Sequence, residues 1–135
     1  LLLRPADGTG PTIIGAHPVA PVPGEMANWR QGLQWIAGNC TGDVIAAGDF
    51  NSTLDHYQGL GTTGELGACH DGAKATGTAA VGSWPTRLPT LVAAPIDHVM
   101  ATAGWRFVGF RVIESEDGAG SDHRPVVAQL RPTAG

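Results

Sequence analysis

The sequence predicts an α/β layered sandwich, in which a mixed, mainly antiparallel sheet is flanked by helices. Three observations favour this class: an amphipathic helix precedes an apolar run of strand length, further strand-like runs follow in series, and Gly and Pro separate the elements. The 135 residues are enough for one domain with its own core. A content of 42% hydrophobic and 15% charged residues is typical of a globular chain.

The first elements are predicted from apolar runs bounded by turns. Residues 1–4 and 12–19 are expected to form a hairpin around a turn rich in Gly and Pro. An amphipathic helix is expected over 25–38, because its apolar residues recur at three- and four-residue spacing. These residues are Met26, Trp29, Leu33 and Ile36.

The remaining elements follow a central strand. The nearly continuous apolar run 43–50 predicts a strand covered on both faces. Residues 52–80 show no sustained period, so we expect a helical turn near 53–60 and then a long loop that shapes a site. Three more strands are expected at 95–102, 105–114 and 124–132.

Charge and hydropathy exclude some classes of function. The net charge is −4 and like charges form no run, which argues against a basic patch that grips a nucleic-acid backbone. No apolar run approaches the roughly 18 to 20 residues that span a bilayer.

Polar side chains gather where the predicted strands end. His17 follows the second strand, Asp49 and Asn51 close the central strand, Asp97 opens a later strand, and 120-GSDHRPV-126 precedes the last. Each of these alone is more typical of a turn or of a structural histidine. Open α/β sheets build their sites at strand ends, so the four clusters together indicate one site.

The order of these clusters resembles a known family. GDFN at 48–51, IDHV at 96–99 and GSDHRPV at 120–126 are similar to the motifs of the endonuclease/exonuclease/phosphatase family, the superfamily of deoxyribonuclease I. The segment 16-AHPVAP-21 resembles the histidine strand of that family, and 84-WP-85 resembles the loop before its IDHV strand. The resemblance implies a deoxyribonuclease I-like fold.

The resemblance also implies a hydrolase that cuts phosphodiester or phosphomonoester bonds by in-line attack of water. Asp49 would orient or deprotonate the water, and Asn51 would donate a hydrogen bond to a phosphate oxygen. His123 would bind the phosphate, and Asp97 would hold His123 in the required tautomer. His17 would act as a general acid or a second phosphate binder.

A divalent cation, Mg²⁺ or Mn²⁺, is implied by the same resemblance, with Asp122 and Asp49 as metal ligands. Asn51, Trp84 and Arg87 would contact the substrate. That substrate is a phosphoester, and the motifs do not separate a nucleic acid, a nucleotide and a phospholipid head group.

The chain resembles only the C-terminal half of the family's domain, which is built as two similar halves. Residues 1–135 are therefore expected to be a fragment of a longer chain, inactive alone, because the Glu that is the main metal ligand lies in the first half. A sheet with helices on one side would also leave an apolar face uncovered. Its expected partner is the missing N-terminal half, or a second copy of the chain.

Two other functions remain to be weighed. The chain could be a non-catalytic relative that binds phosphorylated or protein ligands, which would show no metal-dependent turnover. Residues 121-SDH-123 could also be part of a serine-hydrolase triad, but adjacent residues of an extended segment point to opposite sides and no G-x-S-x-G elbow is present.

Several residues are expected to be structural. Trp29, Trp35 and Trp105 are expected in the core or half-buried, and His98 is expected to be packed or at the rim, facing away from its neighbour Asp97. The two cysteines allow either a disulfide or free thiols. The Ala- and Gly-rich composition suggests a bacterial source and leaves a cytoplasmic, an exported and a membrane-anchored protein open.

Overall fold

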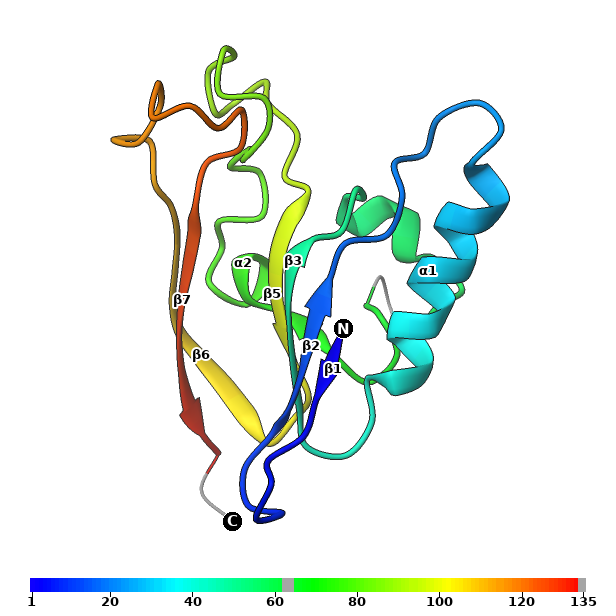
Figure 1. Ribbon diagram of the computed structural model, residues 1–135. Coiled ribbons are helices and arrows are strands. Elements are labelled where there is room, and N and C mark those ends of the chain that lie inside the picture. The colour runs from blue at the N-terminus through cyan, green and yellow to red at the C-terminus, as the bar shows by residue number, and fades with distance from the viewer. Residues whose placement is uncertain (62–64, 134–135) are drawn as a thin grey trace.

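The computed structural model describes residues 1–61 and 65–133 (Figure 1). The elements in chain order are β1 (Leu2–Leu3), β2 (Thr12–Ala16), α1 (Met26–Asn39), β3 (Val44–Asp49), the 3₁₀ helix η1 (Leu54–Tyr57), β4 (His70–Asp71), α2 (Gly72–Ala75), β5 (Asp97–Ala101), β6 (Trp105–Val112) and β7 (Val126–Pro132). None of the described helices is long and apolar enough to cross a membrane.

The strands form two sheets. The first has five strands in the order β1-β2-β3-β5-β4, with β2 parallel to β3 and the other neighbours antiparallel. This confirms the predicted mixed, mainly antiparallel α/β architecture. The expectation of a single sheet is wrong, because β6 and β7 pair with each other in a second, two-stranded sheet.

The core lies between α1 and the five-stranded sheet. The predicted helical spacing places Trp29, Leu33 and Ile36 on the buried face of α1, where they are at most 4% exposed. The sheet contributes fully buried residues from three strands to the same cluster. These are Ile14, Ala46 and Met100.

The β6–β7 hairpin stands on the other side of the five-stranded sheet from α1 (Figure 1). Phe107 of β6 is buried, and its ring packs edge-on against the ring of His70 at 5.3 Å. Part of the sheet face turned away from α1 is exposed, since Leu3 and Ile13 keep 52% and 36% of their surface accessible. The predicted uncovered face is therefore only partly uncovered in this chain.

The segment predicted as a long loop contains more structure than its sequence indicates. Asp71 caps the short helix α2 by accepting a hydrogen bond from the backbone N–H of Lys74 at 2.7 Å. A buried disulfide between Cys40 and Cys69 ties the segment to the end of α1.

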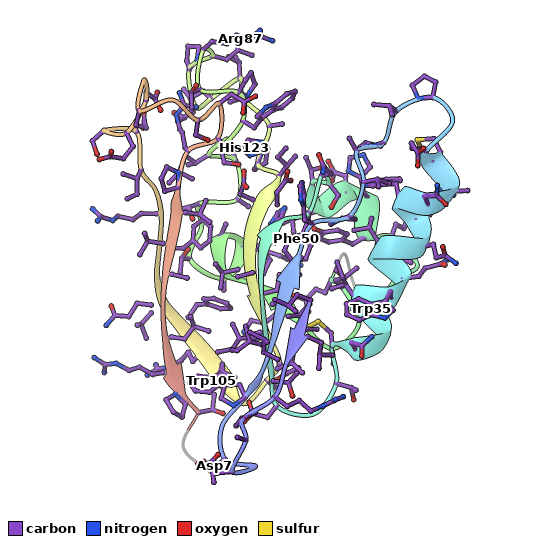
Figure 2. The ribbon with its side chains drawn as sticks, viewed as in Figure 1. Asp7, Trp35, Phe50, Arg87, Trp105 and His123 are labelled. Carbon is purple, nitrogen blue, oxygen red and sulfur yellow. A yellow bond between two sulfur atoms is a disulfide. The ribbon has the colours of Figure 1, made fainter. Side chains whose placement is uncertain are left out.

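Trp35 also differs from expectation, because it lies on the outer side of α1 with 47% of its surface exposed (Figure 2).

Candidate active site

The sheet register brings three predicted site residues to one edge. Ala16 at the end of β2 pairs with Gly48, and Asp49 at the end of β3 pairs with Asp97 at the start of β5. Because β3 and β5 are antiparallel, the end of one strand lies beside the beginning of the other. His17, the residue after β2, reaches the same edge.

His123 is held at this edge by Asp97. The Nδ1 of His123 donates to Asp97 Oδ2 at 2.9 Å, and the buried Ser83 hydroxyl donates to the same oxygen at 2.6 Å. Burial alone would lower the pKa of His123, but the hydrogen bond with Asp97 and the surrounding carboxylate charges outweigh it and hold the pKa above its ordinary value. Ser83 was not predicted, because a lone serine in a loop carries no sequence signal.

Asp49 lies between two imidazoles. Its Oδ2 is 3.7 Å from His17 Nε2 and 3.9 Å from His123 Nε2. These distances exceed a direct hydrogen bond and are within the reach of an ion pair. A cavity of about 440 Å³ is lined by His17, Asp49, Asp97 and His123 together with Ala16 and Ser121. The four residues predicted from separate strand ends thus face one space.

The turn after β3 explains the GDFN sequence locally. Gly48 has φ +145°, and a side chain there would collide with the backbone carbonyl of Ala16. Asn51 has φ +47°, and its backbone N–H donates to Asp49 Oδ1 at 2.7 Å. Its side-chain Nδ2 donates to Pro18 O at 2.9 Å. Asn51 thus fixes the Asp49 carboxylate and joins the loop after β2 to the turn after β3.

Asp122 faces away from this cavity. Its Oδ2 accepts a hydrogen bond from Trp84 Nε1 at 2.9 Å, and this bond lowers the pKa of the Asp122 carboxyl. Trp84, Arg87 and Asp122 line a separate hollow of about 170 Å³ beside His123. Arg87 is exposed at the tip of its loop (Figure 2).

The described residues do not assemble a metal site by themselves. Among them, no group of three or more His, Cys, Asp or Glu side chains is placed to hold a metal ion. Asp49 is flanked by imidazoles, and Asp122 is engaged by Trp84. The predicted ligands Asp49 and Asp122 therefore do not belong to a metal-binding group among the residues that the structure describes.

The model of the Endonuclease/Exonuclease/phosphatase family matches residues 2–123. The chain belongs to this family. Its members are hydrolases of the nuclease and phosphatase kinds, and they generally depend on a divalent metal. A comparison with curated proteins found no match.

Solved structures of the family share the fold of this chain. A humanized D. rerio TDP2 with 14 mutations superposes with a TM-score of 0.71 at 15% identity, covering 93% of this chain and 57% of its own. The mannosyl-6-phosphatase Bt3783 of Bacteroides thetaiotaomicron superposes with a TM-score of 0.65 at 15% sequence identity, covering 95% of this chain and 54% of its own. An endonuclease/exonuclease/phosphatase of Beutenbergia cavernae superposes with a TM-score of 0.60 at 16% sequence identity, covering 90% of this chain and 36% of its own. The chain thus spans about half the length of these proteins, or less.

Within the family motif SDHRPV, Arg124 has a role that the sequence did not reveal. It is 3% exposed, and its Nε and Nη2 donate to the carboxylate of Asp117 at 2.7 to 3.1 Å. Nη2 also donates to the carbonyls of Thr86 and Leu88 at 2.9 Å. Arg124 therefore fixes the loop that carries Trp84 next to the cavity lined by His123.

His98 is packed, which is one of the two placements expected for it. It is 2% exposed, its Nδ1 donates to Asp71 Oδ2 at 2.8 Å, and its Nε2 lies 2.9 Å from the carbonyl of Ser52. His98 thus anchors the segment that follows Asn51.

Ser121 accepts the backbone N–H of His123 at 3.0 Å, while the His123 ring bonds Asp97, so the geometry of a serine triad is not formed.

Proposed function

We propose that this chain supplies the catalytic side chains of a phosphoester hydrolase. The observation that carries the proposal is the arrangement of two imidazoles around Asp49 in one cavity, with one imidazole fixed by a carboxylate. Phosphoester hydrolysis needs a positioned water, donors for the phosphate oxygens and a proton for the leaving oxygen. The cavity contains a group for each task.

His123 binds and neutralises the phosphate in this proposal. Because Nδ1 donates to Asp97, Nε2 is the nitrogen that faces the cavity and Asp49. The raised pKa favours the imidazolium form, in which Nε2–H donates to a phosphate oxygen and offsets its developing charge. The Asp97 side chain orients the ring through its hydrogen bond with Nδ1.

Asp49 orients the attacking water and accepts its proton. Its Oδ1 is fixed by the backbone of Asn51, so Oδ2 is the oxygen that faces the cavity. His17, with 79% of its side chain exposed, can donate a proton to the leaving oxygen and exchange it with solvent. Asn51 has a second Nδ2–H besides the one given to Pro18, and this donor contacts the phosphate.

We further propose that the chain is the C-terminal half of its domain and that the other half completes the metal site. The described residues do not form a metal site on their own, and the chain covers between 36% and 57% of the structures described above. An Mg²⁺ or Mn²⁺ ion held by Asp49 would need further ligands from that half, because Asp122 lines a different hollow. The chain alone is then expected to be inactive.

The substrate is a phosphoester whose remaining part lies against Trp84 and Arg87. Both residues line the hollow beside His123, and Trp84 is 36% exposed. An indole face and a guanidinium suit an aromatic or sugar group joined to the phosphate. Nucleotides, nucleic-acid ends and phospholipid head groups remain the candidate substrates.

The test begins with an intact mass of the natural protein under denaturing conditions. A mass near twice 13.9 kDa supports the missing half, and a mass of 13.9 kDa contradicts it. Hydrolysis of bis(4-nitrophenyl) phosphate and 4-nitrophenyl phosphate is then measured with Mg²⁺, with Mn²⁺ and with EDTA.

Two variants make the test specific to the site. H123A is expected to lose at least about 100-fold in kcat, the usual contribution of a proton-transfer or charge-stabilising group. H70Q, a histidine packed on Phe107 away from the cavity, should keep the activity. Absence of metal-dependent turnover from the natural protein would favour the non-catalytic relative that binds phosphorylated or protein ligands.

A further inference from the structure

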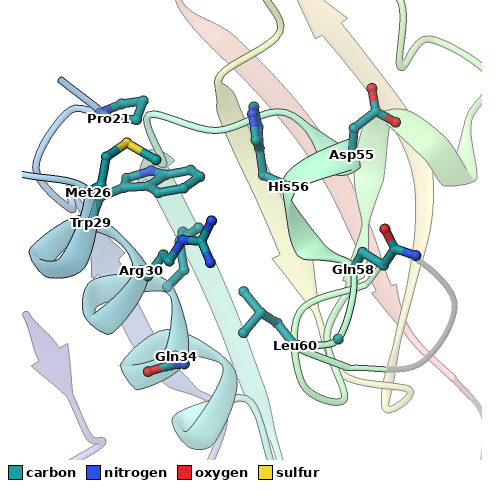
Figure 3. A pocket seen from close by; sticks show the side chains of 11 residues that line it. Pro21, Met26, Trp29, Arg30, Gln34, Asp55, His56, Gln58 and Leu60 are labelled. Atoms are coloured by element: carbon teal, nitrogen blue, oxygen red, sulfur yellow. The ribbon is translucent and has the colours of Figure 1, made fainter. Parts of the chain in front are cut away.

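A second, larger cavity of about 700 Å³ lies between α1 and the segment 55–60 (Figure 3). One wall is formed by Met26, Trp29, Arg30, Leu33 and Gln34 of α1, and the opposite wall by residues 55, 56 and 58–60. None of the catalytic residues proposed above lines this space, which we call the α1–η1 cavity. Its volume is in the range of about 300 to 1,000 Å³ that small-molecule sites occupy.

The floor of the α1–η1 cavity is apolar. Leu33 and Trp29 are 1% and 4% exposed, and Leu60 packs against the same core from the opposite wall. The ring of His56 meets Trp29 edge-on, with centroids 5.2 Å apart. A flat or apolar body placed here would contact side chains that are already fixed by the core.

The polar groups of the cavity include donors on Arg30 and His56, and the amides of Gln34 and Gln58 can also donate. The Arg30 guanidinium extends over the space (Figure 3), and it makes no hydrogen bond or ion pair with any described residue. His56 Nδ1 accepts the backbone N–H of Thr53 at 3.0 Å, which leaves the proton of the neutral ring on Nε2. Asp55, the acidic residue of the lining, turns its carboxylate away from the space (Figure 3). An anionic group is the complement of this set.

We propose that the α1–η1 cavity binds a small organic anion, with its apolar or planar body on Trp29 and Leu33 and its phosphate or carboxylate on Arg30. The bidentate geometry of a guanidinium suits both anions. This site is separate from the catalytic cavity, and its existence does not depend on the proposed hydrolase activity.

One hydrogen bond connects this site to the catalytic turn. Trp29 Nε1 donates to the carbonyl of Asn51 at 3.1 Å, so the indole that forms the floor of one cavity also holds the residue that fixes Asp49. A ligand that packs on Trp29 is therefore expected to change the environment of its indole N–H. This N–H is a local reporter of binding.

The test is a titration of the ¹⁵N-labelled chain followed by the indole N–H resonance of Trp29. The probes are phenyl phosphate, benzoate, phenol and inorganic phosphate. We expect a saturable shift with phenyl phosphate, benzoate or both, and the comparison of these two identifies the preferred anion. Phenol and inorganic phosphate, each lacking one half of the ligand, should bind at least about ten-fold more weakly.

Variants separate this site from the catalytic one. R30Q should weaken binding about ten-fold or more, whereas the matched variant R106Q, at an exposed arginine of β6, should not change it. H123Q should also leave the Trp29 shift intact, because His123 lines the other cavity. The proposal is overturned if no probe shifts Trp29 saturably, if R30Q binds like the unaltered chain, or if phenol or inorganic phosphate binds equally well.

Discussion

Replacing Asp71 by Asn gives a direct test of the buried network behind the turn at residues 48–51. The Asp71 carboxylate is 1% exposed and uses both oxygens: Oδ1 accepts the N–H of Lys74 at 2.7 Å, and Oδ2 accepts from His98 Nδ1 at 2.8 Å. His98 in turn lies 2.9 Å from the carbonyl of Ser52. The side chains of Asp71 and His98 therefore join α2, β5 and the segment after Asn51.

An amide replaces this carboxylate only with weaker hydrogen bonds, although its size is nearly the same. The Asn oxygen can accept the N–H of Lys74 while its NH₂ group donates to Nδ1 of the His98 tautomer that carries its proton on Nε2. Two bonds to a charged carboxylate then become two bonds to a neutral amide. Hydrogen bonds to charged groups contribute about 1.5 to 3 kcal/mol and neutral ones about 0.5 to 1.5, so we expect D71N to lower the free energy of unfolding by about 1 to 2 kcal/mol.

The assay is equilibrium unfolding in urea at pH 7 with the disulfide intact, followed by tryptophan fluorescence. The matched control is D55N, the same chemical change at an exposed aspartate that makes no hydrogen bond with the described residues. D71N should lower the midpoint at an unchanged slope, while D55N should remain within about 0.5 kcal/mol of the unaltered chain. Overlapping curves for D71N and the unaltered chain would refute the assigned network.

Three further predictions concern the site and its supports. D97N should lower the pKa of His123, measured by NMR titration, because the charges of Asp49 and Asp122 then act against burial without the hydrogen bond and charge of Asp97; an unchanged pKa would contradict this. In the unaltered chain the stability from the His123–Asp97 pair is complete below pH 6.5 and lost as the pH rises through the raised pKa. Replacing Cys40 and Cys69 by Ser should cost about 3 to 4 kcal/mol of unfolding free energy, because the bridge closes a loop of 29 residues; an unchanged urea midpoint would contradict this. R124K should destabilise the protein by roughly 1 to 3 kcal/mol and speed hydrogen exchange in the loop that the guanidinium anchors, because a lysine cannot bond a carboxylate and two carbonyls with the same planar geometry. Exchange rates equal to those of the unaltered chain would show that this anchoring is not needed.

The strongest local signals gave correct elements. Helix α1 and strand β3 appear within a residue or two of the predicted bounds, because amphipathic spacing and a continuous apolar run are properties of the local sequence. In the segment from 52 to 80, the helical turn expected near 53–60 is present as η1, residues 62–64 lie outside the described residues, and the two elements β4 and α2 were not predicted. Its β4 and α2 are short, and they are stabilised by Asp71 and by the disulfide to α1 rather than by local periodicity.

The sequence predicted four side chains that line one cavity, but it did not predict the residues that support them. His17, Asp49, Asp97 and His123 stand out in the sequence because each is a polar residue at the end of an apolar strand, and the register then brings them together. Ser83 and Arg124 carry no such signal. The partner of Ser83 lies 14 residues away in the sequence, and the partners of Arg124 lie between 7 and 38 residues away. Only the folded chain therefore shows which groups these two side chains bond.

The sequence by itself determined the family, the main helix and strands, and the side chains of His17, Asp49, Asp97 and His123 that meet in one cavity. It could do so because these properties depend on residue type and on spacing within a few residues. Only the tertiary structure decided that β6 and β7 form a separate sheet, that Asp122 is bonded by Trp84 rather than facing Asp49, and that Arg30 lies over an apolar cavity. Those features depend on contacts between segments distant in the chain, and such contacts are set by packing and hydrogen bonding in the folded state.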